Sequence, residues 1–460
     1  MEFNREQQQA MEHKDGPMLV LAGPGSGKTE VIIRRTRKLI QNYQVAPSSI
    51  LVVTFTKAAA GQMRERFLHL CGVKKSQVTF GTFHGIFYGI LRQAYGITSA
   101  NIAGEEIKYQ ILRQILQNSS LQMEDENDLL ESLAREISTV KNGRIPLSHY
   151  YSASCPDEQF RKIYETYEKR LHGKRLLDFD DLLLKTLELL ADHPPVLESY
   201  RDRFHYVMVD EYQDTNYAQY MLVKLLTDKS RNLCVVGDDD QSIYGWRGAD
   251  IRNILDFEKD FPQAKVIKLE QNYRSTGNIL AAAHSVIKNN RDRKSKKLWT
   301  QQEKGHKIVY SRLANDKEEA AYIAREIQLL ERPGRGYDDF AILYRTNAQS
   351  RLFEDALRRA GIPYQILSGF SFYERKETKD MISYMRLIVN PKDDMAFARV
   401  INEPKRGVGA KTIEKLRALA SVRGESILET VSDPEVADGL SAKSREAVKQ
   451  MTQVIDLCRR

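Results

Sequence analysis

One segment near the amino terminus limits the possible folds most strongly. The apolar run Met18–Ala22 leads through Gly23-Pro24-Gly25-Ser26-Gly27 into Lys28 and Thr29. The run predicts a buried strand, and the apolar repeat over 30–40 predicts a helix. A strand that ends in a glycine-rich turn and opens a helix directs backbone N–H groups at one point, which suits a polyphosphate. The segment therefore predicts an α/β layer with a parallel sheet and a nucleotide at the carboxyl ends of its strands.

Two residues of this turn have predicted chemical roles. Lys28 is expected to contact the β- and γ-phosphates, and Thr29 to coordinate Mg²⁺ through its hydroxyl. The alternative is a glycine-rich turn without a ligand, but such a turn does not require Gly-Lys-Thr in that order. The strict pattern begins with glycine and this one with alanine, a small residue that the turn accommodates. The candidate ATP-binding set here is Ala22, Gly23, Pro24, Gly25, Ser26, Gly27, Lys28 and Thr29.

A second polar pair follows another strand pattern. Tyr206–Val209 runs directly into Asp210 and Glu211. One carboxylate can hold a metal ion, and its neighbour can orient or deprotonate water for attack on a terminal phosphate. For an isolated Asp-Glu pair, a solvated turn or a helix cap is the commoner explanation. The phosphate-binding turn earlier in the chain favours the catalytic interpretation.

Composition narrows the class of protein. The net charge of +8 favours a polyanionic partner through its long-range field, although charge alone does not decide for nucleic acid. The four cysteines stand far apart, without histidines at ligand spacing, so neither a disulfide framework nor a zinc site is predicted. The sequence has no run of about 18 apolar residues and no amino-terminal apolar stretch of a signal peptide. We expect a cytoplasmic protein without a membrane span.

The remaining patterns divide the chain into lobes. Charged, leucine-bearing stretches between Leu91 and Asp192 predict a helical lobe inserted into the α/β lobe. Strand patterns return at Leu233–Gly237 and Lys265–Leu269.

A second α/β lobe is predicted further along. Strand patterns at 307–312 and 340–344 flank a helical pattern at Asp316–Leu330. From Lys376 onward the chain again has a helical pattern, with turns at Asn390-Pro391 and Arg406-Gly407.

Ten short motifs follow one another along the chain. They are FNREQQQA, AGPGSGKT, TFTKAAAGQMRERF, TFHG, LDFDDLL, VDEYQDTN, VVGDDDQSIYGWRGAD, QNYRST, DFAILYRTNAQSR and RGVG. With these motifs the chain resembles the UvrD/PcrA/Rep family of superfamily 1A DNA helicases along essentially its whole length. Each motif alone is moderately specific, whereas the ordered set is highly specific.

The resemblance implies roles around ATP hydrolysis. Asp210 would hold Mg²⁺, Glu211 would be the catalytic base, and Gln241 would sense the γ-phosphate or its attacking water.

Three further residues would contact ATP. Gln7 would recognise the adenine edge and Tyr273 would stack on adenine. Arg274 would reach the γ-phosphate from the second lobe, where a cation stabilises the transition state only when the cleft closes.

The resemblance also implies a set of DNA contacts. Phe55, Tyr244 and Trp246 match positions on which family members stack bases, and Arg247 and His84 lie in neighbouring motifs. Stacking tolerates any base, as a motor that moves along arbitrary sequence requires. The alternative is that these aromatic residues belong to a hydrophobic core.

The fold implied is a RecA-like P-loop domain with a helical insertion, then a partial second RecA-like domain with a partial helical insertion. The expected boundaries are 1–91 and 192–272 for domain 1A, 92–191 for 1B, 273–375 for 2A and 376–460 for 2B. Motifs V and VI, the latter with a second arginine finger, do not occur in the sequence.

The implied activity is ATP- and Mg²⁺-dependent translocation on single-stranded DNA with 3′ to 5′ polarity, coupled to duplex unwinding. Single-strand/duplex junctions and repair or replication proteins are the implied partners of a monomer. Without motifs V and VI, the chain alone is expected to hydrolyse ATP weakly and to unwind poorly.

Two other function classes remain as alternatives. One is a non-enzymatic DNA-binding subunit that needs a second polypeptide to complete the motor. The other is a P-loop kinase or GTPase, for which no acceptor-binding or guanine-reading segment is visible.

Two charged clusters have a structural interpretation. Asp178, Asp180 and Asp181 precede the apolar run LLLKTLELL and are expected to cap its helix and not to bind a metal. The basic run 291–297 is expected to be a solvated loop.

Two positions depart from the family pattern. Glu30 stands where many relatives have arginine, and Tyr212 replaces a phenylalanine.

Overall fold

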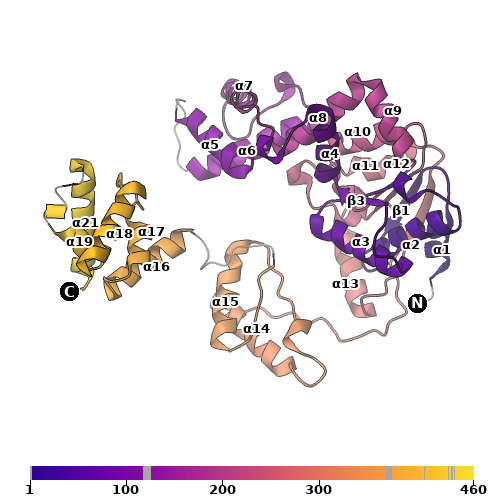
Figure 1. The fold of residues 1–460 in the computed structure, drawn as a ribbon. Coiled ribbons are helices and arrows are strands. Elements are labelled where there is room, and N and C mark those ends of the chain that lie inside the picture. Colours follow the sequence, from indigo (N-terminus) through magenta and orange to yellow (C-terminus); the bar gives the residue numbers. More distant parts are fainter. Residues whose placement is uncertain are drawn as a thin grey trace. The chain divides into compact units, whose positions relative to one another are not determined.

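The computed structural model describes residues 3–117, 126–367, 376–408, 410–433, 435–436, 439 and 441–459. The chain forms two compact units, Met1–Ile308 and Val309–Arg460 (Figure 1). Among the described residues, no helix combines the length and the apolar character that a membrane span requires. Residues 368–375 of the predicted domain 2A, and the last residue of the RGVG motif, lie outside the described residues.

A six-stranded parallel sheet forms the centre of the first unit, with strand order β3-β2-β4-β5-β1-β6. The strands are β1 (Met18–Ala22), β2 (Ile50–Thr54), β3 (Thr79–Thr82), β4 (Tyr206–Val209), β5 (Leu233–Gly237) and β6 (Lys265–Leu269). Every residue of β1, β4 and β5 is buried. Such continuous apolar strands form because helices cover both faces of a parallel sheet.

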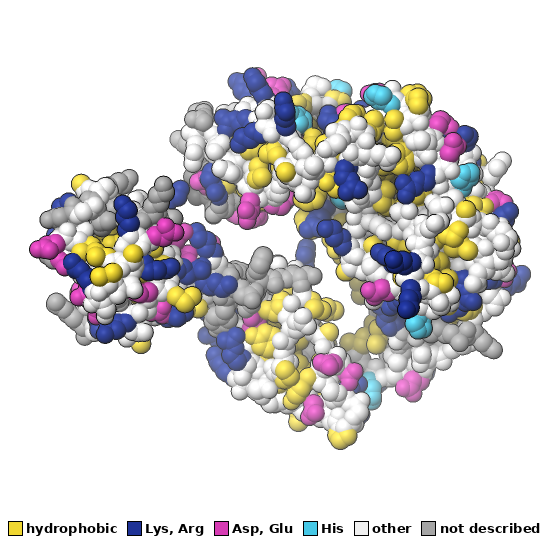
Figure 2. All heavy atoms as spheres, in the orientation of Figure 1, with side chains coloured by type: hydrophobic (Ala, Val, Ile, Leu, Met, Phe, Trp, Pro, Cys, Tyr) yellow, Lys and Arg dark blue, Asp and Glu magenta, His cyan; other side chains and the backbone are white. Residues whose placement is uncertain are grey.

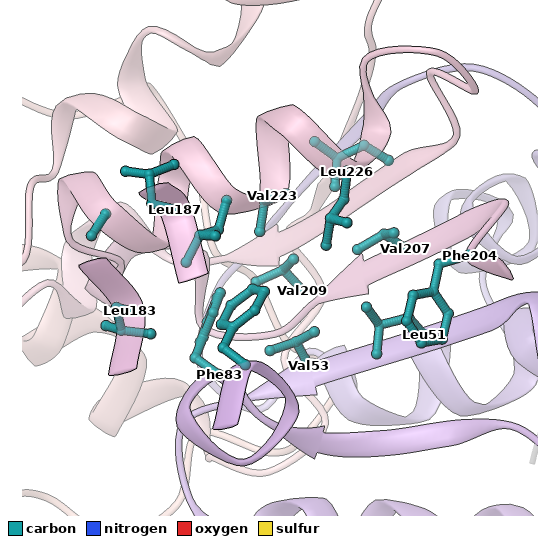
Figure 3. Close-up of a cluster of buried hydrophobic side chains, with 14 of the residues drawn as sticks. Leu51, Val53, Phe83, Leu183, Leu187, Phe204, Val207, Val209, Val223 and Leu226 are labelled. Carbon is teal, nitrogen blue, oxygen red and sulfur yellow. The ribbon is translucent and has the colours of Figure 1, made fainter. Parts of the chain in front are cut away.

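Alternate strand residues enter two separate cores. On one face, Val20, Val52 and Met208 pack against α1 (Arg5–Glu12), α2 (Lys28–Gln41) and α3 (Lys57–Cys71). On the other face, Leu51, Val53, Val207 and Val209 meet side chains such as Phe83, Leu183 and Leu226 (Figure 3). The helices of this second face are α4 (Phe83–Tyr95), α8 (Phe179–Asp192), α9 (Pro194–Arg203), α10 (Tyr217–Thr227), α11 (Arg252–Leu255) and α12 (Phe257–Asp260).

The predicted helical insertion has a core of its own. It is built from α5 (Glu105–Leu116), α6 (Glu126–Gly143) and α7 (Asp157–Gly173). The buried leucines of α8 belong instead to the core of the sheet. Residues assigned to domain 1B up to 191 therefore include a helix that packs directly on domain 1A.

The predicted cap of α8 is confirmed for Asp178 and Asp181 and is wrong for Asp180, whose carboxylate accepts hydrogen bonds from Ser138 and Asn142. Asp178 accepts the backbone N–H of Asp181 at 2.9 Å, in a capping box. The metal alternative is disfavoured because Lys141 Nζ already occupies the cluster, 2.9 Å from Asp178, 2.6 Å from Asp181 and 3.0 Å from Glu168.

The first unit ends beyond the last strand. Helix α13 (Gly277–Ile287) and residues up to 308 group with the sheet. The predicted start of domain 2A at 273 stays a prediction.

The second unit contains two helical clusters. α14 (Asp316–Leu330) and α15 (Ser350–Arg359) share a small core, and the predicted helix at Asp316–Leu330 is confirmed. A second core joins α16 (Lys376–Val389), α17 (Asp394–Val400), α18 (Ala410–Arg423), α19 (Ile427–Ser432) and α21 (Ala442–Arg459).

The strands predicted at 307–312 and 340–344 are wrong for the described residues. Neither segment joins a ladder there, and the side chain of Leu343 is 94% exposed. A strand requires a neighbour for its backbone groups, and no described segment supplies one.

Candidate functional site

A hollow of about 290 Å³ lies at the carboxyl ends of the strands, where the glycine-rich turn and the Asp-Glu pair meet. It is lined by Pro24, Gly25, Ser26, Gly27, Lys28, Thr29, Glu30, Arg66, Glu211, Gln241 and Arg274. Five segments that are separated in the sequence thus converge on one cavity. All of them belong to the first unit.

The turn between β1 and α2 needs its glycines. Gly25 and Gly27 have φ of +67° and +85°, a conformation that side chains disfavour. A Cβ at Gly25 would also lie 2.8 Å from both Asn272 Nδ2 and Arg274 Cβ. Gly27 is the N-cap of α2 and offers no side-chain hydrogen bond, which leaves the first N–H groups of the helix to an anion.

Glu211 adopts a strained backbone conformation directly after β4. Its φ of +51° is unusual for a residue with a side chain and costs about 1–3 kcal/mol. The conformation brings Glu211 Oε2 to 3.3 Å from Lys28 Nζ. The predicted base and the predicted phosphate-binding lysine are therefore in contact.

Asp210 is buried, and one of its two carboxylate oxygens accepts no hydrogen bond from the described residues. Burial, together with the charge of Glu211, raises the pKa of Asp210 to about 7. Its Oδ1 has no hydrogen-bond partner among the described residues. A buried carboxylate oxygen without a donor suits a divalent cation, for which carboxylate and hydroxyl oxygens are good ligands. Asp210, with Thr29 in the lining of the hollow, fits the predicted metal site.

Asp214 is a second strongly shifted carboxyl group in this segment. Burial and the charge of Glu211 raise its pKa to about 6, and its buried Oδ1 accepts no hydrogen bond from the residues that the structure describes.

Gln7 and Tyr273 lie beside the turn. Gln7 is buried and its Nε2 donates to Ser26 O at 3.0 Å. The Tyr273 hydroxyl lies 3.3 Å from Gln7 Oε1 and 3.0 Å from Gln271 Oε1, and its backbone N–H donates to Gly25 O. In this structure the amide of Gln7 is held by protein groups, so its contact with adenine stays a prediction.

The acidic turn 238–240 after β5 holds Gln241. Gln241 Nε2 donates to Asp238 Oδ2 at 2.7 Å. The bond ties the amide of Gln241, the predicted γ-phosphate sensor, to the turn after β5, and Gln241 also lies in the lining of the hollow.

The solvated-loop prediction for 291–297 is wrong for Arg293 and Lys296. The side chain of Lys296 is 1% exposed and forms ion pairs with Asp238 and Asp239. Arg293 donates to both oxygens of Asp240, at 2.8 and 2.6 Å. Because these carboxylates lie at the end of a buried strand, they require cations, and Lys296 and Arg293 pack against them.

Comparison with known proteins identifies the family. Residues 3–262 match the model of the UvrD/REP helicase N-terminal domain, and residues 267–435 match that of the UvrD-like helicase C-terminal domain. The chain belongs to the UvrD/REP helicase family. It is 44% identical over 461 residues to the ATP-dependent DNA helicase PcrA of Bacillus subtilis, a match that covers 99% of this chain and 62% of the relative.

Two staphylococcal relatives give the same result. The PcrA helicases of Staphylococcus epidermidis and Staphylococcus aureus are 42% and 43% identical, each over 96% of this chain. Both matches cover 61% of the relative. The chain thus spans about three fifths of the length of these relatives.

In this family member the predicted aromatic contacts divide into two groups. Tyr244 and Trp246 are 41% and 58% exposed, so the core alternative is wrong for both. The Arg247 guanidinium lies 4.7 Å from the centroid of the Trp246 ring. Together they form an exposed aromatic turn around Gly245–Arg247.

Phe55 and His84 are more enclosed. The Phe55 ring packs 5.6 Å from Phe83 at the edge of the core. His84 lies edge-on to Phe179, 5.9 Å away, and burial lowers its pKa. Phe179 is exposed, and sequence reasoning did not single it out, although it lies in the LDFDDLL motif.

A larger hollow of about 560 Å³ lies along the edge strand β3. Its basic lining residues are Lys57, Arg64, Arg92 and Arg203. Figure 2 shows Lys and Arg side chains in the region of α3 and α4. These cations add to the positive field that a polyanion would meet.

The two departures from the family pattern have structural accounts. Glu30 forms an ion pair with Arg34 on α2. Tyr212 is buried edge-on to Phe257, with ring centroids 6.0 Å apart.

Proposed function

We propose that this chain binds ATP and single-stranded DNA as part of a DNA helicase that moves 3′ to 5′ and couples ATP hydrolysis to duplex unwinding. One observation carries the proposal. Gln241, which lines the hollow with Lys28, Glu211 and Arg274, lies three residues before Tyr244 in the exposed aromatic turn. A single short segment thus joins the nucleotide site to the side chains suited to stacking on bases.

In the proposed reaction Lys28 exchanges its contact with Glu211 for the β- and γ-phosphates of ATP. Glu211 then orients a water molecule and accepts its proton as the water attacks the γ-phosphate, while the bond from the γ-phosphorus to the bridging β-phosphate oxygen breaks and ADP leaves. Arg274 stabilises the charge that develops on the transferred phosphoryl group. Asp210 and Thr29 would hold Mg²⁺, which neutralises phosphate charge when bound.

The DNA would stack on Tyr244 and Trp246, with Phe55, His84 and Arg247 nearby. Gln7 and Tyr273 would hold the adenine. We extend the proposal to single-strand/duplex junctions and to partners in DNA repair or replication, for a monomer working in the cytoplasm.

A non-enzymatic DNA-binding subunit is the weaker candidate. Such a module needs neither a lysine for phosphates nor a base, yet Lys28, Glu211 and Arg274 line the same hollow.

An ATPase assay with and without oligo(dT) tests the proposal. We expect single-stranded DNA to stimulate turnover, and Glu211→Gln to lower it by at least about 100-fold while ATP still binds. The matched control is Glu158→Gln on α7, an exposed position outside the hollow, which should leave turnover unchanged. Equal turnover in Glu211→Gln and the control would contradict the proposal, as would an absence of DNA binding.

A further inference from the structure

We propose that Gln213 is a positioning residue that couples the orientation of the base Glu211 to the position of the aromatic turn. The inference rests on the proposed function and names a side chain to which the motifs assign no role. Gln213 lies two residues after Glu211 and is buried.

Both the nitrogen and the oxygen of the Gln213 side-chain amide form hydrogen bonds. Its Nε2 donates to Glu211 Oε2 at 3.0 Å and to Asp214 Oδ2 at 3.1 Å. Its Oε1 accepts the backbone N–H of Asp238 at 3.0 Å. An amide has two donor hydrogens and one acceptor oxygen, so this arrangement satisfies each kind of group and fixes the orientation of the amide.

The bond to Glu211 leaves one carboxylate oxygen available. Lys28 and Gln213 both donate to Oε2 of Glu211, whereas Oε1 accepts no hydrogen bond from the described part of the chain. A base that takes a proton from water needs one oxygen held and the other accessible. Gln213 is the donor that remains when Lys28 moves to the phosphates.

The opposite side of Gln213 contacts the segment that carries the aromatic turn. Its backbone carbonyl accepts the Ser242 hydroxyl at 3.2 Å, and Asp238, bonded to its side chain, holds Gln241. Ser242 is two residues before Tyr244. Three successive hydrogen bonds therefore join the base to Gln241, and a separate one joins Gln213 to the start of the aromatic turn.

The end of β5 is shaped around this amide. A Cβ at Gly237 would lie 2.6 Å from Gln213 Oε1 and 2.9 Å from Ile254 Cδ1. Gly237 does not have a positive φ, so its glycine is needed for space and not for backbone conformation. The close approach keeps the amide in one position.

The consequence is a linkage between nucleotide and DNA. If DNA binding displaces segment 238–246, the hydrogen bond from Gln213 to Glu211 changes. A nucleotide that moves Lys28 away from Glu211 changes the same hydrogen bond. Such coupling is reciprocal, because each ligand must change the affinity for the other by the same factor.

The test measures binding linkage and does not depend on turnover. The affinity of the chain for fluorescently labelled oligo(dT) is measured by anisotropy with and without a non-hydrolysable ATP analogue and Mg²⁺. In the unsubstituted chain we expect the analogue to change the dissociation constant about tenfold, within the usual range of coupling. In Gln213→Met the ratio should fall below about twofold, while each ligand alone still binds.

Gln219→Met is the matched control. Gln219 is a buried glutamine on α10 that caps the helix through Asn216 and does not line the hollow. Its substitution should leave both the linkage and turnover unchanged. If Gln213→Met does not fold, Ser242→Ala, which removes only the bond to the Gln213 carbonyl, should still reduce the ratio.

The outcomes separate the two proposals. An unchanged ratio in Gln213→Met, or in Ser242→Ala where the first variant does not fold, overturns the role of Gln213. A ratio near one in the unsubstituted chain overturns it as well. Failure of the unsubstituted chain to bind the analogue or oligo(dT) at all would instead reject the proposed function.

A kinetic measurement separates positioning from a general structural role. Gln213→Met should lower kcat for ATP by roughly 10- to 100-fold, the effect of a misplaced catalytic group, with the KM for ATP unchanged. A loss confined to KM would contradict the proposal.

Discussion

The buried lysine of the basic segment gives the most direct test of the electrostatics around the site. The side chain of Lys296 is 1% exposed, and those of Asp238 and Asp239 are fully buried. Lys296→Met keeps the length and packing of the side chain but removes its charge. The two carboxylates are then left without their buried cation, although Arg293 still bonds the neighbouring Asp240.

The expected loss in the free energy of unfolding follows because the substitution removes the cation and leaves both carboxylates in place. Removing one partner of a buried ion pair destabilises a protein by about 3–5 kcal/mol, because the remaining charge is desolvated without compensation. That is a large part of a typical unfolding free energy of about 5–15 kcal/mol. For a unit of this size it corresponds to a fall in Tm of roughly 5–10 °C.

Tryptophan fluorescence is the suitable assay. The chain has two tryptophans, Trp246 and Trp299, and both lie in the first unit, so a thermal or urea transition followed by their emission reports that unit alone. The control is Lys297→Met, because Lys297 is the exposed neighbour whose backbone N–H, and not its side chain, bonds to Glu270. If both variants melt within about 1 °C of the unsubstituted chain, the reasoning about the buried pair is wrong.

A second variant shows whether charge is the cause. Adding Asp239→Asn to Lys296→Met removes one of the uncompensated carboxylates and should recover part of the lost stability. A further loss of similar size would indicate that packing, and not charge, decides.

Three further predictions concern the site. Because the pKa of Asp210 is raised to about 7, the metal-free fold should lose stability as the pH rises from the ordinary pKa of an aspartate to about 7. Asp210→Asn should remove this loss, which thermal melts at pH 5 and 8 measure. Because Mg²⁺ must displace the same proton, its affinity should fall about tenfold per pH unit below pH 7, measured by titration calorimetry with a nucleotide analogue; a flat profile would exclude Asp210 as the ligand. Trp246→Ala should weaken oligo(dT) binding by about 1–3 kcal/mol, or roughly 5- to 150-fold in Kd, without changing ATP affinity; an unchanged Kd would remove this residue from the DNA site.

The sheet and the phosphate-binding turn could be predicted because their determinants are local. The burial of β1 follows from five consecutive apolar residues, and the turn conformation from Gly25 and Gly27. The convergence of Lys28 and Glu211 also follows, since the carboxyl ends of parallel strands lie at the same edge of a sheet.

The predictions that failed depended on a partner elsewhere in the chain. Segments 307–312 and 340–344 have the pattern of strands, but a pattern does not show what a strand pairs with. The exposed Leu343 shows that apolar character without a neighbour does not produce burial.

The role proposed for Gln213 illustrates a different limit. An uncharged residue inside VDEYQDTN carries no pattern of its own, and the residue types of the motif predict that the two acids before it carry the chemistry. Only the structure brings its amide to Glu211, Asp214 and Asp238, from two strand ends. The sequence offers one signal: the base Glu211 shares its motif with Asp210 and Asp214, and a carboxylate among other acids requires a hydrogen-bond donor to hold it in its charged form.

The same argument explains the burial of Lys296 in the basic segment. Three consecutive acids at 238–240 follow an interior strand, and buried carboxylates require cations. The charges of the run 291–297, taken alone, predict a solvated loop. A run of like charges at the end of a buried strand therefore predicts that residues of the opposite charge, from elsewhere in the chain, are buried against it. The difference between Lys296→Met and its exposed neighbour Lys297→Met measures how strong that requirement is.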